Sequence, residues 1–401
     1  MKYQNVFFIL FFLWSCDIKK NNLEIKPEEV FQKIYDNEKF SLSFEPINTI
    51  QTADGGYIVY SRIEVAASNF GGVYLQKIDK FGNFVNAVQL DESYTNPLPN
   101  LFIRNNSIYF FTMDKTSLTA KLVEIDKDLA ILSSTLVVGS SYPLACNEKK
   151  NGNFLLLYYN RDENLSVCTE LDAAGQIIKE KKYDVGSGFG SGEPNANILA
   201  HLIRPTTDFP FAIGETIGGQ LYFNGFNNYA FSTTFFLFED SGKTAIIQGF
   251  NDQKGISSLL PLTASDYAIC HFNSKGIFVL PKFALNTTGI SSTSSLKGYP
   301  LIEFSESSKI ISKKLTISGT EAVVFAGQTN NNYFTLYFYN ALNGNFMNSI
   351  SVGYGSKHKI SDIINTKEGG IAIVGTAYLI GKLPRIFLYK YSNTESASWV
   401  K

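Results

Sequence analysis

The chain contains few of the residues from which metal sites, redox centres and disulfide frameworks are usually built. Its 401 residues include three histidines and four cysteines. The histidines show no metal-ligand spacing, and the cysteines do not follow the pattern of a disulfide framework. These residues are His201, His271 and His358, and Cys16, Cys146, Cys168 and Cys270. We therefore predict no cofactor and no metal site, and we expect the last three cysteines to be buried free thiols in strands.

The sequence also lacks a strong charge of either sign. The formal net charge is −1, and no run of Lys and Arg forms a stripe that would follow a phosphate backbone, so we expect no nucleic-acid partner. Hydrophobic residues make up 44% of the chain and charged residues 18%, which permits a large core. Only 2 Trp and 3 Met accompany 33 Phe and 22 Tyr, and this supply of aromatic residues favours strands.

The N-terminus has the features of an export signal. Lys2 precedes an unbroken apolar run, Val6–Leu13, which is too short to span a bilayer but suits a signal peptide. The next residues, Leu13-Trp14-Ser15-Cys16, resemble the lipobox of bacterial lipoproteins. That resemblance implies cleavage before Cys16 and acylation of its thiol and new amine, and several acyl chains give stable anchoring. The alternative is a plain secretory signal with a chance cysteine.

These features predict three segments. Residues 1–15 are a lipoprotein signal peptide, residues 16–38 a polar tether with a short helix, and residues 39–401 the folded domain. The helix is expected over Pro27–Asp36, because Pro27 suits a first helical position and Val30 and Ile34 are four residues apart. The implied location is the bacterial cell envelope, with the membrane as a partner through the lipid. Asp17 directly after the cysteine resembles an inner-membrane retention signal of some bacteria, whereas acidic residues near that position accompany export to the cell surface in others. The membrane and the side on which the protein is anchored therefore stay open.

From about residue 40 onward, two hairpin patterns recur. The first is Thr52-Ala-Asp54-Gly55-Gly56-Tyr57, which returns at Thr366-Lys-Glu368-Gly369-Gly370-Ile371. The second is a strand followed by Asp-x-x-Gly, as at Asp79–Gly82 and Asp172–Gly175. Asp-Gly and Gly-Gly supply the positive φ that tight hairpin turns need. The turns of the second kind end at residues 82, 129, 175, 242, 289 and 344, in steps of 47, 46, 67, 47 and 55 residues.

A repeat of 45–50 residues with four short strands has the size of one blade of a β-propeller. We therefore predict an all-β fold, a β-propeller of seven four-stranded blades, with insertions in blades four and six. The predicted blades are 48–90, 99–139, 141–186, 195–250, 255–296, 300–352 and 358–401. Six or eight blades, or two stacked β-sandwiches, are the alternatives. A leftover strand at Phe40–Phe44 is expected to complete the last sheet and close the ring, so deleting residues 38–46 should lower thermal stability.

The hairpins resemble the β-propeller repeats of secreted and lipid-anchored bacterial proteins that carry Thr-x-Asp-Gly-Gly-Tyr turns. The resemblance covers residues 48–401, with clear motifs in blades one and seven. Trp-Asp dipeptides, kelch glycine pairs in every blade and the Asp box of sialidases are absent from the sequence. The resemblance therefore implies a fold and no activity.

The two faces of such a ring differ in their loops. The turns after the first and third strands of each blade are tight and share one face, whereas the other connections are long and lie on the opposite face. Because function concentrates on loops held by a rigid scaffold, we expect the ligand on the face with the long connections. The long connections are 62–72, 91–100, 160–165, 186–197, 215–233 and 377–384.

Candidate ligand-binding residues are taken from these connections. Aromatic rings among Asn and Gly suit sugars or peptides, and loop acids are the first to test for catalysis. The candidates are Arg62, Asp162, Glu163, Glu215, Tyr222, Phe226, Asn227 and Tyr229. An ordinary hairpin over residues 215–229 and plain surface charge for the acids are the alternatives. A ring also brings distant residues to its axis, so a site built on the histidines stays open.

Together these features predict a lipid-anchored binding or scaffold protein for a glycan, peptide or protein partner. The alternatives are a hydrolase or lyase acting on extracellular polysaccharide, and a purely structural part of an envelope complex. No catalytic residue is assigned. Two or more acids with raised pKa in an axial pocket would favour the enzyme, and an aromatic-lined groove without them would favour binding.

Overall fold

The structure is a computed structural model of the chain. It describes residues 30–36, 42–65, 68–186, 194–205, 209–239, 242, 245–249, 255–305, 308–353 and 356–401. The predicted signal peptide, Cys16 and the first two residues of the predicted strand at Phe40–Phe44 lie outside these ranges.

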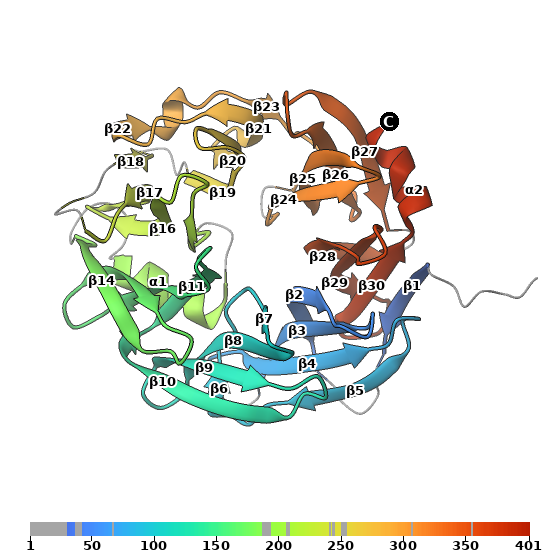
Figure 1. The fold of residues 1–401 in the computed structure, drawn as a ribbon, viewed down its shortest axis with the longest axis horizontal. Helices are drawn as coiled ribbons and strands as arrows, with labels where there is room; N and C mark the ends of the chain where they lie inside the picture. Colours follow the sequence, from blue (N-terminus) through green and yellow to red (C-terminus); the bar gives the residue numbers. More distant parts are fainter. Residues whose placement is uncertain are drawn as a thin grey trace, which may run out of the picture.

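Strands dominate the described residues and form seven four-stranded blades around a common centre (Figure 1). Blade one holds β2 (Phe44–Gln51), β3 (Tyr57–Ile63), β4 (Gly72–Ile78) and β5 (Phe84–Gln89). Blade two holds β7 (Phe102–Arg104), β8 (Ser107–Asp114), β9 (Thr119–Ile125) and β10 (Ile131–Ser141). Blade three holds β11 (Pro143–Glu148), β12 (Phe154–Asn160), β13 (Leu165–Leu171) and β14 (Ile177–Asp184). Blade four holds β15 (Ala212–Glu215), β16 (Leu221–Asn227), β17 (Ala230–Phe236) and β18 (Ala245–Gln248).

The remaining blades follow the same plan. Blade five holds β19 (Gly255–Pro261), β20 (Asp266–Asn273), β21 (Gly276–Ala284) and β23 (Tyr299–Pro300). Blade six holds β24 (Ile311–Ile317), β25 (Thr320–Gln328), β26 (Phe334–Asn340) and β27 (Phe346–Val352). Blade seven holds β28 (Lys357–Asn365), β29 (Ile371–Tyr378), β30 (Arg385–Tyr391) and β1 (Phe31–Tyr35). By hydrogen bonding, blades one and two join into one nine-stranded sheet, because β6 (Tyr94–Thr95) bridges β4 and β8.

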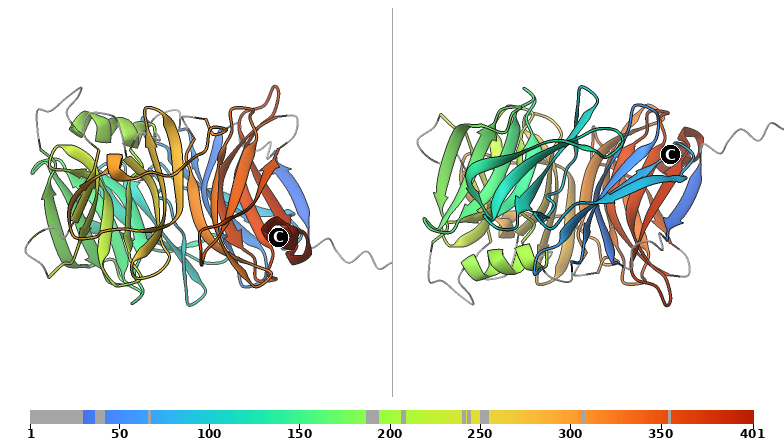
Figure 2. Two further views of the ribbon diagram at one scale, coloured as in Figure 1. Left: turned by 90° about the horizontal axis from the view of Figure 1, so that it is seen from above. Right: turned by 90° about the horizontal axis from the view of Figure 1, so that it is seen from below.

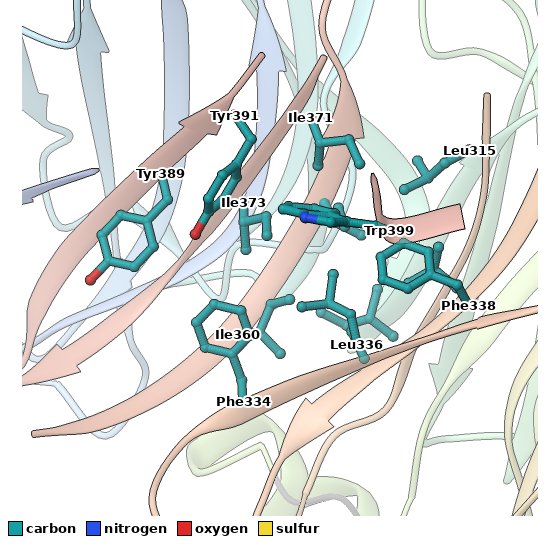
Figure 3. Close-up of a cluster of buried hydrophobic side chains, with 14 of the residues drawn as sticks. Leu315, Phe334, Leu336, Phe338, Ile360, Ile371, Ile373, Tyr389, Tyr391 and Trp399 are labelled. Carbon is teal, nitrogen blue, oxygen red and sulfur yellow. The ribbon is translucent and has the colours of Figure 1, made fainter. Parts of the chain in front are cut away.

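Each interface between neighbouring blades holds its own cluster of buried apolar side chains. In the described residues there are seven such clusters, each shared by two adjacent blades. Figure 3 shows the cluster between blades six and seven, where Phe338 faces Trp399 at the C-terminus. The blades therefore have no separate cores, and the hydrophobic effect stabilises the ring through its interfaces. The prediction of a seven-bladed β-propeller is confirmed.

The N-terminal strand closes the ring, but it is not the predicted one. β1 pairs antiparallel with β30 over all its five residues, so Phe31–Tyr35 supplies the outer strand of blade seven. The predicted helix over Pro27–Asp36 is therefore wrong for its described part. The propeller also begins before residue 39, and Phe44 belongs to the innermost strand of blade one. Pairing with an available sheet edge outweighs the weak local helix preference of this segment.

The recurrent tight turns have the predicted chemistry. In the turn after β4, the Asp79 carboxylate accepts hydrogen bonds from the backbone amides of Phe81 and Asn83, and Gly82 has φ +77°. Asp126 and Asp172 accept the same pair of bonds in the next two blades. Two features therefore define the turn. The aspartate carboxylate accepts hydrogen bonds from backbone amides two and four residues later, and a residue with positive φ follows it. These turns lie on the face opposite to the long connections.

Three elements depart from a regular ring. Helix α1 (Pro194–Ile203) precedes blade four and lies on one face of the ring (Figure 2). β22 (Gly289–Ser292) leaves blade five and pairs parallel with β18 of blade four, and η1 (Thr293–Ser295) follows it. Helix α2 (Asn393–Ala397), capped by Ser392, and η2 (Ser398–Val400) bring Trp399 against blade six. None of the described helices has the length and apolar character needed to cross a membrane.

The prediction for the cysteines of the folded domain is confirmed. Cys146, Cys168 and Cys270 are free, buried and located in strands β11, β13 and β20. Burial raises the pKa of all three thiols, to about 12 for Cys270.

Candidate functional site

A cavity of about 810 Å³ lies at the axis of the ring, and we call it the axial cavity. Many of its lining residues lie in or just before the innermost strand of each blade, which is the strand nearest the centre in Figure 1. Others follow the second strand of a blade, counted from the centre. All seven blades contribute, for example through Glu45, Pro97, Leu144, Ala212 and Ser257. The axial cavity therefore opens on the face with the long connections, where we expect the ligand.

The two insertions predicted from the repeat length supply part of the lining. The longer one carries α1, whose His201, Leu202 and Ile203 line the cavity. The shorter one ends in Ser308–Ile310, directly before β24. These extra residues enter the ring between an outer strand and the next innermost strand, so they reach the axis.

Arg62 fixes the C-terminal end of α1 at the wall of the axial cavity. Its guanidinium donates hydrogen bonds to the Ile203 carbonyl (2.6 Å), the Leu202 carbonyl (3.5 Å) and the Asn96 Oδ1 atom (3.0 Å). A cation at the last carbonyls of a helix also interacts favourably with the helix dipole. At Gly71 a Cβ atom would lie 2.4 Å from Arg62 Nε, so this glycine gives the guanidinium its space.

The charged groups of the axial cavity are mainly cationic. Among its described lining residues there are four cations and two carboxylates. They are Arg62, Arg204, Lys309 and Lys359, and Glu45 and Glu64. Burial lowers the pKa of Arg62, whereas the charges of the two glutamates raise it, and an arginine stays protonated under such conditions.

Lys309 and Lys359 form no ion pair with any residue that the structure describes. The nearby acid Asp362 is already occupied, because its carboxylate pairs with Lys313 (3.0 Å) and accepts bonds from Asn48 Nδ2 (2.8 Å) and the Thr49 amide (3.1 Å). The Lys309 side chain is exposed to the cavity. The protein around the cavity, and then the charge of Lys359, lower the pKa of Lys309.

His201 stands in the same cationic surroundings. Its ring packs edge-on against Phe211 with centroids 4.9 Å apart, and Nδ1 is buried without a partner among the described residues. Burial, and then the charges of Arg62 and Lys309, lower the pKa of His201 to about 4. The imidazole is therefore neutral at pH 7 and leaves the positive charge of the cavity to the lysines and arginines.

Of the predicted ligand-binding residues, the structure places Arg62 in the axial cavity. Tyr222, Phe226 and Asn227 are buried in β16 and do not line it. The Tyr222 hydroxyl donates to the Leu259 carbonyl (3.2 Å), and Asn227 Nδ2 donates to Thr234 Oγ1 (3.0 Å). The segment 215–233 is therefore an ordinary hairpin, and its Tyr222 and Phe226 belong to the core.

The other candidates lie outside the axial cavity. Asp162 and Glu163 are exposed in the turn between β12 and β13, where Glu163 pairs with Lys182 (2.8 Å). Glu215 ends β15 and accepts from the Lys150 amide (2.8 Å) on the tight-turn face. Tyr229, 49% exposed, forms a tight turn with φ +67° against Gly186.

Lys309, Lys359 and the role of His201 were not anticipated. The sequence indicated Lys309 and His201 only indirectly, because the two long steps of the repeat predicted the insertions in which they lie. Nothing local distinguishes Lys359 from other lysines in strands.

Two further features were named as criteria for function, namely a metal site and acids with raised pKa in an axial pocket. Among the described residues no three His, Cys, Asp or Glu side chains lie close enough to hold a metal ion. Every described carboxyl group whose pKa is shifted has it lowered, and none of these groups lines the axial cavity.

A second hollow of about 630 Å³ lies between blades six and seven. Its polar groups bind one another, since His358 Nε2 bonds the Tyr389 hydroxyl (2.9 Å) and Gln32 Nε2 donates to the Tyr391 hydroxyl (3.2 Å). Tyr389, Tyr391 and Trp399 are each less than 10% exposed. The axial cavity is therefore the better candidate site.

No model of a known protein family matches the chain, and no curated protein matches its sequence. Solved propeller structures resemble it at low identity. Prolyl oligopeptidase B from Galerina marginata is 12% identical with a TM-score of 0.48, covering 85% of this chain and 50% of that one. The Dos1 propeller is 10% identical with a TM-score of 0.47, covering 90% and 96%. The β-propeller domain of the trilobed protease from Pyrococcus furiosus is 11% identical with a TM-score of 0.45, covering 88% and 99%.

Proposed function

We propose that this protein is a lipid-anchored propeller of the bacterial cell envelope that binds a ligand in its axial cavity. The ligand is a glycan, a peptide or a segment of a protein partner. The observation that carries the proposal is the axial cavity itself, to which all seven blades contribute and whose cationic groups are only partly compensated. Its volume of about 810 Å³ falls within the range of small-molecule sites.

The binding proposal is tested with the chain from Asp17 to Lys401, which contains all the strands that the structure describes. The chain is screened against glycan and peptide arrays, and each hit is measured at equilibrium. Ser361 lines the axial cavity, so Ser361→Trp should fill part of it and abolish binding. Ser274→Trp, on an exposed turn outside the cavity, is the matched control and should retain binding. Absence of any hit, or equal binding by both variants, would refute the proposal.

The lipid anchor is a separate part of the proposal. It rests on the sequence around Cys16, which resembles a lipobox. We expect wild-type cells to incorporate labelled palmitate into the protein and to hold it in the membrane fraction, whereas Cys16→Ser should lose the label. Cys146, Cys168 and Cys270 are buried and serve as internal controls. Wild-type protein without label, together with membrane partitioning of the variant, would contradict the anchor.

A further inference from the structure

The axial cavity contains more specific chemistry than a general binding site requires. Of its four cations, Arg62 is satisfied by Asn96 and the end of α1. Lys309 and Lys359 have no ion-pair partner in the described part of the chain, and, after burial, the charge of Lys359 lowers the pKa of Lys309. An anion between them would remove this repulsion and form charge-assisted hydrogen bonds, which are stronger than neutral ones.

The lining of the axial cavity also contains an unsatisfied hydrogen-bond donor. Asn96 is 5% exposed, its Oδ1 is occupied by Arg62, and its Nδ2 has no partner among the described residues. The lining contains two carboxylates, Glu45 and Glu64, and their negative charges favour the protonated form of Arg62. The described lining therefore has more cations than carboxylates and a free donor at Asn96, which favours a ligand with an anionic acceptor group.

The uncharged part of the wall combines an extended apolar surface with scattered Ser, Thr and Asn side chains, and its aromatic residues are Phe70, Phe211 and His201. Six prolines line the axial cavity, namely Pro46, Pro97, Pro99, Pro143, Pro205 and Pro210. Leu98, Leu144 and Ile310 lie among them, and the described lining residues include no Tyr or Trp. Sugar sites usually offer aromatic planes and many polar groups, whereas aliphatic and proline surfaces suit an apolar ligand.

From these observations we infer that the axial cavity binds an apolar carboxylate, with the carboxylate held by Lys309 and Lys359 and the apolar body packed on the proline-rich wall. The inference rests on the proposed function, because it names the ligand class of the same site. Two sources share this chemistry. The free C-terminus of an apolar peptide is among the ligands of the proposed function, whereas a medium-chain fatty acid is not, so binding of octanoate alone would support the inference and correct the proposed ligand.

The test measures binding by the chain from Asp17 to Lys401 in a calorimeter. The ligands are an acetylated three-residue apolar peptide with a free C-terminus, octanoate, the amide of each, and a uronate trisaccharide. At least one carboxylate should bind about tenfold or more tightly than its own amide, because a charged hydrogen bond is lost in the amide. The tighter of the two carboxylates identifies the source.

Variants locate the carboxylate. Lys309→Met and Lys359→Met remove one charge each at similar length and should weaken carboxylate binding about tenfold while leaving amide binding unchanged. Lys275→Met, on an exposed turn of the same face outside the axial cavity, should change neither. The comparison of acid with amide in the wild-type protein needs no variant, so it holds if a variant fails to fold.

Three results would overturn the inference. They are equal affinity for acid and amide, binding of the uronate trisaccharide alone, and carboxylate binding that survives both lysine substitutions. In each case a hit in the array screen that Ser361→Trp abolishes would leave the proposed function intact. If that screen also yields no ligand, the proposed function fails with the inference.

Discussion

At the scale of single residues, Arg62 holds the C-terminal end of α1 at the wall of the axial cavity. Arg62→Met keeps the length of the side chain but leaves the Leu202 and Ile203 carbonyls and Asn96 Oδ1 without their donor. Because hydrogen bonds to charged groups contribute roughly 1.5–3 kcal/mol, we expect local stability to fall by about 2 kcal/mol. Hydrogen exchange of the amides in α1 should accelerate more than tenfold.

Arg161→Met is the matched control for this variant. Arg161 is exposed, and among the residues that the structure describes it reaches only the Tyr142 hydroxyl, at 3.4 Å. Its loss should change stability by less than about 0.5 kcal/mol. Unchanged exchange in α1 after Arg62→Met would show that the helix is held by its apolar face alone.

His201 makes the stability of the ring depend on pH. Its pKa is about 4 in the folded chain against 6.5 for the free side chain, so above pH 6.5 it is neutral in both states. Below pH 6.5 the unfolded chain takes up a proton that the folded chain does not, and stability falls as the pH falls toward 4. We expect this loss to reach about 2 kcal/mol at pH 5 in urea denaturation.

The comparison with His201→Gln isolates this effect. Glutamine does not titrate, so the variant should lose about 2 kcal/mol less than wild type between pH 7 and pH 5. The aspartates with lowered pKa, such as Asp114 at about 2, are common to both proteins and cancel in the difference. Parallel pH profiles for the two proteins would mean that His201 is solvated in the folded state.

At the scale of elements, β1 connects the last blade to the first. Phe31 and Tyr35 are buried in the cluster between blades seven and one, and the Tyr35 hydroxyl donates to the Gly82 carbonyl (2.9 Å). The Asp36 carboxylate pairs with Arg385 at 2.6 Å. A chain that starts at residue 37 should therefore lose at least the roughly 3–5 kcal/mol of a buried phenylalanine, and its Tm should drop sharply by circular dichroism.

A chain that starts at residue 30 retains β1 and is the control. It should melt at the same temperature as the chain that starts at Asp17, because no described element precedes β1. Equal melting of the chains starting at 30 and 37 would show that pairing with β30 adds nothing to the closure of the ring.

The same elements show how far the sequence predicts the fold. Turn chemistry depends on neighbouring residues, so Asp79 and Gly82 were enough to predict their hairpin. The recurrence of this turn along the sequence predicted the number of blades. The pairing of β1 with β30 joins segments about 350 residues apart, so spacing within Pro27–Asp36 could not reveal it. Helix α1 was not predicted, although Pro194 suits a first helical position and the buried Ile198 and Leu202 are four residues apart. Strand patterns on both sides of this segment favoured an irregular connection instead.

The site was less accessible to prediction than the fold. The repeat indicated the correct face, and Arg62 was found because it begins a long connection of that face. Tyr222 and Phe226 were misassigned because a buried strand of a propeller is as rich in aromatic residues as a ligand site. Lys309 and Lys359 line the same cavity only because blades six and seven converge on the axis, and that convergence is a property of the closed ring.

At the scale of the whole molecule, the shared cores predict that the ring unfolds as one unit. Cys146 belongs to the cluster between blades two and three, Cys168 to that between blades three and four, and Cys270 to that between blades five and six. Loss of one blade exposes the clusters on both its sides, so partly unfolded rings are unfavourable. Burial also raises the pKa of these thiols, which suppresses their reaction in the folded chain.

We therefore expect the three thiols to become reactive together. In the chain from Asp17 to Lys401, a pulse of thiol reagent at increasing urea concentration, read for each cysteine by mass spectrometry, should give one midpoint for Cys146, Cys168 and Cys270. The same midpoint should appear in circular dichroism, as a cooperative transition requires. Labelling of Cys270 at clearly lower urea than Cys146 would instead mean that blades five and six separate first. The ring would then behave like a linear repeat array, whose units unfold one after another.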